Sequence, residues 1–408
     1  MSKYRLHPLS YRDRKIQKMA EQEQTLRETL DKIAKEQGFV NYKLDIKPTS
    51  SEGANYTSVL FFATISEEGR DDAKVFAKVA CVGEKVRIIA PFQIYDNEIY
   101  FYTDLIKTYR DIERKHGVPE EERLVTSKFY GHNNEFLKET IVMEDLTDRG
   151  YQMFDRFQTF DWNYAQESVR QMAKLHALSI AYSIEKPEEF DKKTQNLKMQ
   201  NNNMDTMKDF MQSMLEKAIT TVKEEFADRV QQFLKETTIP EKFASLTQPH
   251  RRLVLVHGDY RPSNLMHKLN EDGTYNVIPI DFQTLNRSNP VVDLLYFIFT
   301  GSDQEFRTKY YQKTLDHYYS ELSASLKRFN LKPDDLYSRE DFEYDLKQAL
   351  PYGLLISFML LLLVTVDVSN VPTITDDSDL SAFNIAPNEA YKKRINEIIE
   401  DYIKLGVL

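Results

Sequence analysis

The chain has 408 residues, of which 41% are hydrophobic and 29% charged, a composition typical of a globular protein with a sizeable core. The formal net charge of −10 argues against a nucleic-acid backbone as partner but is compatible with an anionic ligand in a locally basic cleft. The single cysteine, Cys81, excludes an internal disulfide, and the polar N-terminal segment lacks the apolar stretch of a signal peptide, so we expect a cytoplasmic protein.

The first third of the chain predicts a small lobe that is rich in strands. A charged helix is expected over 12–36 and ends near Gly38. Residues 56–65 and 74–80 are β-branched and aromatic, and the polar turn between them predicts a hairpin. Further elements are expected as a helix over 92–108 and as strands over 128–130 and 139–143.

The rest of the chain predicts a larger, mainly helical lobe. Apolar residues recur at steps of three and four over 163–183 and along a methionine-rich stripe over 207–230. The stripe could line an adaptable pocket, but core packing is the more common use of such a pattern. The polar segments 186–203 and 369–388 are expected to be loops. Later helices are expected over 303–328, 340–366 and 388–404.

These patterns together predict an α+β fold with two lobes, divided into residues 1–143 and 144–408. The most apolar run, 354–366, is shorter than the roughly 20 residues that a membrane span needs, so a buried helix is the preferred interpretation.

The chemistry is indicated by three polar residues, Asp259, Asn264 and Asp281, at the ends of short apolar runs. Phosphoryl transfer needs a carboxylate that orients the attacking hydroxyl and accepts its proton, and oxygen ligands that hold magnesium against the phosphates. Asp259 is the predicted base. Asn264 and Asp281 are the predicted Mg²⁺ ligands, because magnesium prefers hard oxygen donors.

Arg261 lies two residues after the predicted base. The stretch from Asp259 to Asn264 parallels the Asp-x-Lys-Pro-x-Asn loop of many protein kinases, with Arg261 in the place of the lysine. In that place it would contact the γ-phosphate as a catalytic residue, and the alternative is a solvent-exposed arginine. The role of the intervening Tyr260 stays open.

The N-terminal lobe supplies the predicted ATP contacts. Lys78 stands inside an apolar strand, where an unpaired charge is costly, so an ion pair with Glu98 of the following helix is expected. Lys74 is the alternative lysine, but it stands at the start of the strand. Further predicted nucleotide contacts are Gly53 and Ser58 in a phosphate-covering loop, and the carbonyl of Glu144 and the amide of Leu146 at the adenine.

These residues together resemble the ecdysteroid kinase-like family, also called the CHK kinase-like family, in the choline kinase and aminoglycoside phosphotransferase group. The resemblance extends from about Gly53 to the last helices, and Asp281-Phe282-Gln283 is typical of that family. It implies a protein-kinase-like fold and ATP-dependent phosphorylation of a hydroxyl on a small molecule. Ecdysteroids are the substrate class for which the family is named, and detoxification of other hydroxylated compounds is a second implied role.

The sequence also favours a small acceptor over a protein. A protein kinase carries an Ala-Pro-Glu segment after its second aspartate, and none follows Asp281. The 110 residues of segment 147–256 could instead wall a pocket. The alternatives are a kinase for choline-like or xenobiotic alcohols, or a catalytically silent protein that binds ATP and a small molecule. Neither a nucleic-acid partner nor a membrane span is expected.

Overall fold

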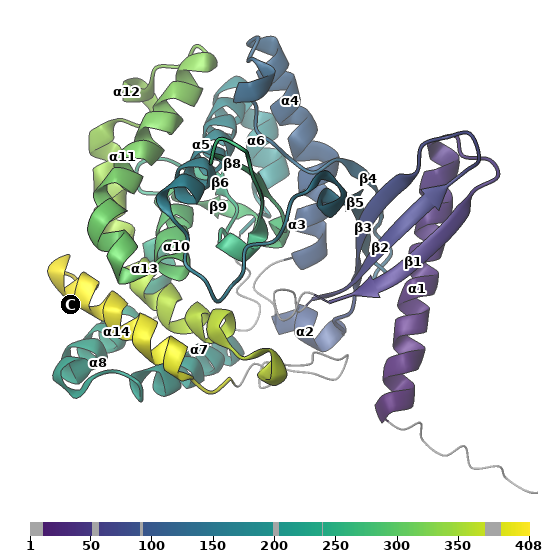
Figure 1. Ribbon diagram of the computed structural model, residues 1–408. Helices are drawn as coiled ribbons and strands as arrows, with labels where there is room; N and C mark the ends of the chain where they lie inside the picture. Colours follow the sequence, from purple (N-terminus) through teal and green to yellow (C-terminus); the bar gives the residue numbers. More distant parts are fainter. Residues whose placement is uncertain (1–10, 51–56, 90–92, 199–203, 239, 372–384) are drawn as a thin grey trace, which may run out of the picture.

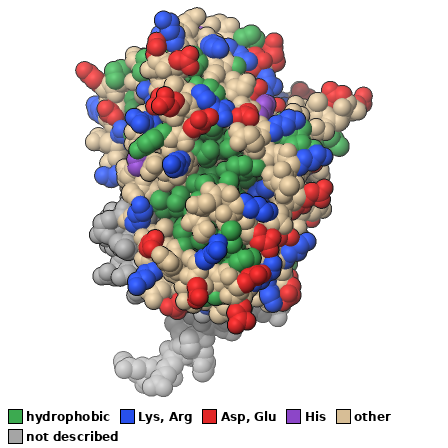
Figure 2. All heavy atoms as spheres, turned by 90° about the vertical axis from the view of Figure 1, so that its left-hand side faces the viewer, with side chains coloured by type: hydrophobic (Ala, Val, Ile, Leu, Met, Phe, Trp, Pro, Cys, Tyr) green, Lys and Arg blue, Asp and Glu red, His purple; other side chains and the backbone are tan. Residues whose placement is uncertain are grey.

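An open N-terminal sheet and a larger helical body make up the molecule (Figure 1). The structure, a computed structural model, describes residues 11–50, 57–89, 93–198, 204–238, 240–371 and 385–408. On the face drawn in Figure 2, acidic and basic side chains are interspersed around a central area of hydrophobic ones, so the net charge is not gathered there in one patch.

The N-terminal sheet is antiparallel and has the strand order β1-β2-β3-β5-β4. The predicted hairpin is confirmed as the pair of β2 and β3. The analysis of the sequence missed β1, which is an edge strand whose Lys-Leu-Asp-Ile-Lys-Pro-Thr sequence carries a proline that only an edge tolerates easily. The strands are β1 (Lys43–Thr49), β2 (Ser58–Ser66), β3 (Ala73–Ala80), β4 (Phe129–Asn133) and β5 (Thr140–Glu144).

The two faces of strand β3 have different roles. Val75, Ala77 and Val79 pack in one cluster with buried residues of helix α1 (Tyr11–Glu36), which covers that side of the sheet. Because successive side chains of a strand point to opposite faces, Lys78 points to the other side, toward the helical body. The apolar alternation of β3 therefore fixes the direction in which its lysine points.

The helix predicted over 92–108 is longer and less regular than expected. It consists of α3 (Ile94–Tyr100), a π-helical turn (Phe101–Leu105) and α4 (Ile106–Lys115), which is a continuous path without a loop. Tyr109 and Ile112 bury apolar surface beyond the predicted end and explain the extension. A short helix, α2 (Glu84–Ile89), precedes this path and was not predicted.

The helical body is built around α5, α10, α11 and α13, whose apolar residues form the largest core cluster. The predicted loop 186–203 is wrong over α6, because Pro187 occupies a favourable first-turn position and Phe190 and Thr194 are buried. The predicted stripe over 207–230 is two helices, and its described residues Met214, Leu215 and Val230 are buried in the core. The helices are α5 (Trp162–Glu185), α6 (Pro187–Thr194), α7 (Met204–Ile219), α8 (Glu224–Thr237), α9 (Pro240–Thr247), α10 (Val291–Gly301), α11 (Gln304–Arg328), α12 (Pro333–Leu336), α13 (Arg339–Thr365) and α14 (Glu389–Lys404).

Helix α13 is long and apolar enough, by length and composition alone, to cross a membrane. However, 67% of its most apolar window is buried inside the molecule, where α13 packs against α10. This agrees with its interpretation as a buried core helix.

Two small antiparallel pairs carry the loops with the predicted catalytic residues. Strand β6 (Val254–Val256) pairs with β9 (Asn286–Ser288), and β7 (Leu265–Leu269) pairs with β8 (Tyr275–Pro279). The predicted fold class, α+β with a small strand-rich N-terminal part and a larger, mainly helical C-terminal part, is confirmed. The segments that follow β6 and β8 are in contact, since His257 Nε2 lies 2.9 Å from the Ile280 carbonyl oxygen.

Candidate functional site

The carboxylate of Asp293 anchors the loop that follows β6. Asp293 of α10 accepts hydrogen bonds from the backbone amides of His257 (2.7 Å) and Gly258 (2.9 Å), and His176 Nε2 lies 3.1 Å from the same carboxylate. Gly258 has a φ of +82°, and a Cβ atom there would lie 2.4 Å from the carbonyl oxygen of Thr284. Only glycine fits this turn without strain, so the turn fixes the direction of the residue that follows.

Asp259, the predicted base, is surrounded by three side chains. The Tyr296 hydroxyl donates to Asp259 Oδ1, Arg261 Nε lies 3.1 Å from the same oxygen, and Asn264 Nδ2 donates to Oδ2 at 2.8 Å. A carboxylate offers about four acceptor positions, so Oδ2, with one described donor, has room for a further hydroxyl. The side chain is 14% exposed and can be reached from outside.

Arg261 is buried, with 9% of its surface exposed, so the solvent-exposed alternative is wrong. Its guanidinium forms an ion pair with Asp259, and Arg261 is also one of the residues that line a small cavity. Tyr260, whose role the sequence left open, is fully buried and donates from its hydroxyl to the backbone oxygen of Ser168 at 2.7 Å. It anchors the loop to α5.

Lys78 joins two carboxylates in the interior. Its Nζ lies 2.9 and 3.1 Å from the two oxygens of Glu98 and 2.6 Å from Asp281 Oδ1. All three side chains are nearly inaccessible, with 7% or less of each exposed. Lys74, the alternative lysine, instead pairs with Asp148 at the surface.

Burial and the neighbouring charges both shift the pKa values of Lys78 and Glu98 within this triad, whose third member is Asp281. Burial alone would lower the pKa of Lys78, but Asp281 and Glu98 together raise it above its ordinary value. Burial raises the pKa of Glu98, Lys78 opposes this shift and the neighbouring Asp281 adds to it, and together they bring the pKa to about 7. One ammonium group therefore faces two buried carboxylates, and the site has a surplus of negative charge.

The two predicted metal ligands are brought together by the backbone. The Ile280 amide donates to the Asn264 carbonyl oxygen at 3.0 Å, which places Asn264 beside Asp281. Asp281 has a φ of 70°, a left-handed conformation that is uncommon for residues other than glycine and is typical of functional sites. The Asn264 amide nitrogen faces Asp259, so its oxygen faces the other way.

This donor set fits magnesium. One carboxylate and one amide oxygen, completed by phosphate oxygens, is the kind of site that Mg²⁺ uses at nucleotides. The described residues contain no cluster of three or more His, Cys, Asp or Glu that could hold a metal alone. A divalent cation at Asp281 would also offset the surplus negative charge of the triad.

Three further polar residues, Thr57, Asn97 and Gln283, connect Asp281 to the N-terminal lobe. Gln283 Nε2 donates to Asp281 Oδ2 at 3.2 Å, and Thr57 Oγ1 donates to Gln283 Oε1 at 3.0 Å. Asn97 of α3 donates to the backbone oxygens of Gln283 (3.2 Å) and Leu285 (3.1 Å). The Asp-Phe-Gln motif could have pointed to Gln283, whereas no motif in the sequence points to Asn97.

Of the remaining predicted nucleotide contacts, three lie among the described residues. Gly53 lies outside the described residues, and Ser58 begins β2 opposite Ala80. Glu144 ends β5, and Leu146 opens a 3-10 turn that the Asp145 side chain caps. Leu146 also packs in an apolar cluster with Tyr151, Met266 of β7 and Ile278 of β8, and Ile280 packs against this cluster.

The sequence matches a known protein family over most of its length. The sequence profile of the ecdysteroid kinase-like family matches residues 52–331, so α13 and α14 lie beyond the match. No curated protein matches the chain by sequence.

The chain is similar to three solved structures at low identity. For a microcompartment-associated aminopropanol kinase the identity is 12% and the TM-score 0.44, over 90% of this chain and 94% of that one. For the GDP complex of an aminoglycoside 2'-phosphotransferase-IIIa the values are 11% and 0.43, over 92% and 97%. For a glucosamine kinase they are 13% and 0.34, over 92% and 84%.

Proposed function

The chain belongs to the ecdysteroid kinase-like family, and we propose that it transfers the γ-phosphoryl group of ATP to a hydroxyl group of a small molecule. The observation that carries the proposal is the contact network from Lys78 and Glu98 through Asp281 and Asn264 to Asp259. It supports the proposal because it joins a cation that could bind phosphates, two oxygen-bearing side chains that could hold a metal and a carboxylate that could serve as base, which are the parts that phosphoryl transfer needs.

Each residue of the network has a separate task in the proposed reaction. Asp259 Oδ2 accepts the hydrogen bond of the acceptor hydroxyl and orients its oxygen. That oxygen forms a bond to the γ-phosphorus while the bond from phosphorus to the β-phosphate oxygen breaks, and the hydroxyl proton passes to Asp259. The products are ADP and a phosphate monoester.

Other residues hold the phosphates in line. Lys78, fixed by Glu98, contacts the α- and β-phosphates, and Asn264 and Asp281 would hold magnesium. Magnesium supplies neutralisation of charge on the transferred group when it is bound. Gly53, Ser58, Glu144 and Leu146 keep the nucleotide-binding roles that their sequence positions predict.

An ecdysteroid or a similar lipophilic alcohol is the acceptor that we propose, and detoxification of other hydroxylated compounds is the second candidate role. The family membership supports this choice. Phosphorylation of a choline-like alcohol and silent nucleotide binding are the alternatives that the test must separate.

The test measures transfer from γ-labelled ATP to ecdysteroids, amino alcohols and xenobiotic alcohols by the purified full-length chain. Asp259→Asn is expected to lower kcat by about a thousandfold without changing nucleotide binding, because it removes the base alone. Asp281→Asn is expected to abolish transfer and to weaken binding of ATP in the presence of magnesium.

Asp228→Asn is the matched control, because Asp228 is an exposed aspartate on α8. Melting curves show whether each variant folds. Unchanged turnover in Asp259→Asn would refute the proposed mechanism. Magnesium-dependent ATP binding with no transfer to any alcohol would instead identify a silent binding protein.

A further inference from the structure

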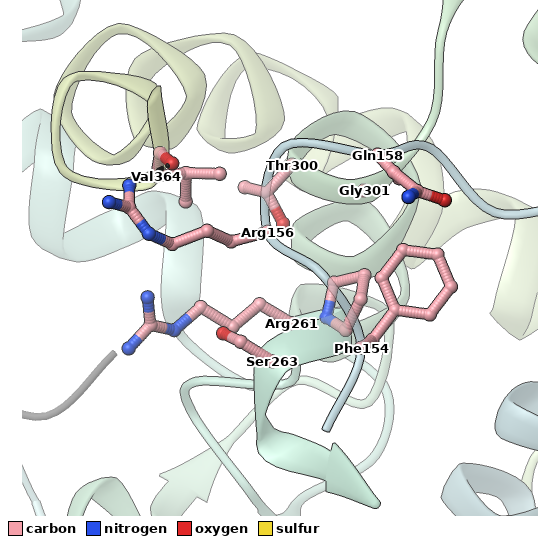
Figure 3. A pocket seen from close by; sticks show the side chains of 9 residues that line it. Phe154, Arg156, Gln158, Arg261, Ser263, Thr300, Gly301 and Val364 are labelled. Carbon is pink, nitrogen blue, oxygen red and sulfur yellow. Dashed lines mark hydrogen bonds between the residues drawn. The ribbon is translucent and has the colours of Figure 1, made fainter. Parts of the chain in front are cut away.

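Helix α10 contacts the loop that follows β6 at both of its ends. Asp293, in its first turn, accepts hydrogen bonds from the backbone amides of His257 and Gly258. Thr300, in its last turn, lines the same small cavity as Arg261 of the loop (Figure 3). All 11 residues of α10 are buried, so close packing on every side fixes the position of the helix.

Tyr296 lies between these two ends of α10, and its hydroxyl reaches the predicted base. The hydroxyl donates a hydrogen bond to Asp259 Oδ1, the oxygen that Arg261 Nε approaches to 3.1 Å. Only 4% of the surface of Tyr296 is exposed. Burial and the neighbouring carboxylate of Asp259 raise the pKa of Tyr296 well above its ordinary value, so the hydroxyl keeps its proton and serves as a donor.

The two oxygens of the Asp259 carboxylate therefore have different surroundings. Oδ1 accepts the hydrogen bond of Tyr296, whereas Oδ2 accepts one from Asn264 Nδ2 at 2.8 Å. A general base must aim a lone pair at the proton that it accepts, so the rotation of the carboxylate about its Cβ–Cγ bond affects the rate. A hydrogen bond from a firmly packed helix to Oδ1 restricts that rotation and leaves Oδ2 for the acceptor.

Resting on the function proposed above, we infer that Tyr296 is a positioning residue for phosphoryl transfer. Its hydroxyl holds Asp259 in the rotation at which Oδ2 meets the acceptor hydroxyl. It acts through the base and not on the phosphates, so its loss slows transfer and leaves the affinity for ATP unchanged. The competing interpretation is a core tyrosine that donates to Asp259 only because a buried hydroxyl needs an acceptor.

The kinetic test compares Tyr296→Phe with Tyr391→Phe in the purified full-length chain. Tyr391 is the matched control, because its buried hydroxyl also donates a hydrogen bond, at 3.0 Å to the backbone oxygen of Phe358. Transfer is measured from γ-labelled ATP to an ecdysteroid, or to whichever tested alcohol the wild type uses best. Tyr296→Phe is expected to lower kcat by about tenfold to a hundredfold, the usual effect of a lost hydrogen bond to a charged group. KM for ATP should change by less than about twofold in both variants, and so should kcat in Tyr391→Phe.

A second measurement tests the contact itself without relying on activity. Urea unfolding gives the stability of the wild type, Tyr296→Phe, Asp259→Ala and the double variant. Asp259→Ala removes the acceptor of the Tyr296 hydroxyl, so Tyr296→Phe should cost less stability in that background than in the wild type. The double variant should be at least as stable as Asp259→Ala, a comparison that holds even where Tyr296→Phe alone does not fold.

Several results would overturn the inference. They are an unchanged kcat in a folded Tyr296→Phe, an equal loss in Tyr391→Phe, a loss confined to KM for ATP, and an equal stability cost of Tyr296→Phe in both backgrounds. In each of these cases the wild type still transfers phosphate, so the proposed function stands. Absence of transfer from the wild type to any alcohol refutes the proposed function instead, which separates the two failures.

Discussion

At the scale of single residues, the decisive feature is the imbalance of charge around Lys78. Glu98 and Asp281 both contact its ammonium group, and burial raises the pKa of Glu98 from an ordinary value of 4.5 to about 7. The folded chain therefore binds this proton more tightly than the unfolded chain does. The contribution of Glu98 to stability falls as pH rises from about 4.5 to about 7, and is fully lost above that range.

This imbalance predicts that nucleotide binding releases protons. A magnesium ion at Asp281 adds positive charge near Glu98 and should lower the pKa of its carboxyl group. Binding of ATP with magnesium is therefore expected to release a fraction of a proton near pH 7 and to tighten as pH rises through that value.

Calorimetric titration in buffers of different ionisation enthalpy measures the released proton. Glu98→Gln removes the titrating group, so its binding should depend much less on the buffer once the protonation of ATP itself is subtracted. Net proton uptake by the wild type, or equal buffer dependence in both proteins, would contradict the assignment.

At the scale of secondary-structure elements, the C-terminal end of α10 packs closely against Phe160 and against Pro262 in the loop that follows β6. A Cβ atom on Gly301 would lie 2.4 Å from Phe160 Cε1 and 2.6 Å from Pro262 Cγ. The helix thus approaches the loop as closely as a glycine allows, and the position of Pro262 sets that of Arg261 beside it.

Gly301→Ala is expected to destabilise the fold by about 1–3 kcal/mol through overpacking and to lower kcat. The sign of the change in unfolding free energy is diagnostic. In a helix without this contact, replacing glycine with alanine would stabilise the helix by roughly 1 kcal/mol. Urea unfolding measures the free energy, and an increase in stability would show that Phe160 and Pro262 move aside freely.

Some helices and strands could be predicted from the sequence pattern and others could not. The strand of Lys78 and the long helices were predicted because their alternation and three-four spacing reflect burial directly. The edge strand Lys43–Thr49 is charged and contains proline, and α6 is polar on most of its surface, so neither produces such a pattern. Tertiary contacts stabilise both.

At the scale of the whole molecule, contacts distant in sequence join the N-terminal sheet and α3 to the catalytic loops. The rings of Phe101 and Phe282 stack at 3.4 Å, and Asn97 donates to two backbone oxygens of the segment after Asp281. The sequence predicted Asp259, Asn264 and Asp281 as site residues because their motif is nearly continuous, and the structure places them close together. It could not reveal Tyr296, which lies in a helix that reads as plain core. The division into 1–143 and 144–408 stays a prediction.

The contact between Lys78 and Asp281 also has a consequence for the order in which ligands bind. The ammonium group occupies an oxygen of Asp281, so a free magnesium ion must compete with it, and Lys78 would lose one of its two anions. In the proposed function, phosphate oxygens of ATP would replace Asp281 beside Lys78 and so would release the carboxylate for the metal. Magnesium and ATP should therefore each strengthen the binding of the other. In thermal shift assays, magnesium alone should change the melting temperature little, and magnesium with ATP should raise it strongly. An equal rise with magnesium alone would mean that Lys78 does not compete with the metal for Asp281.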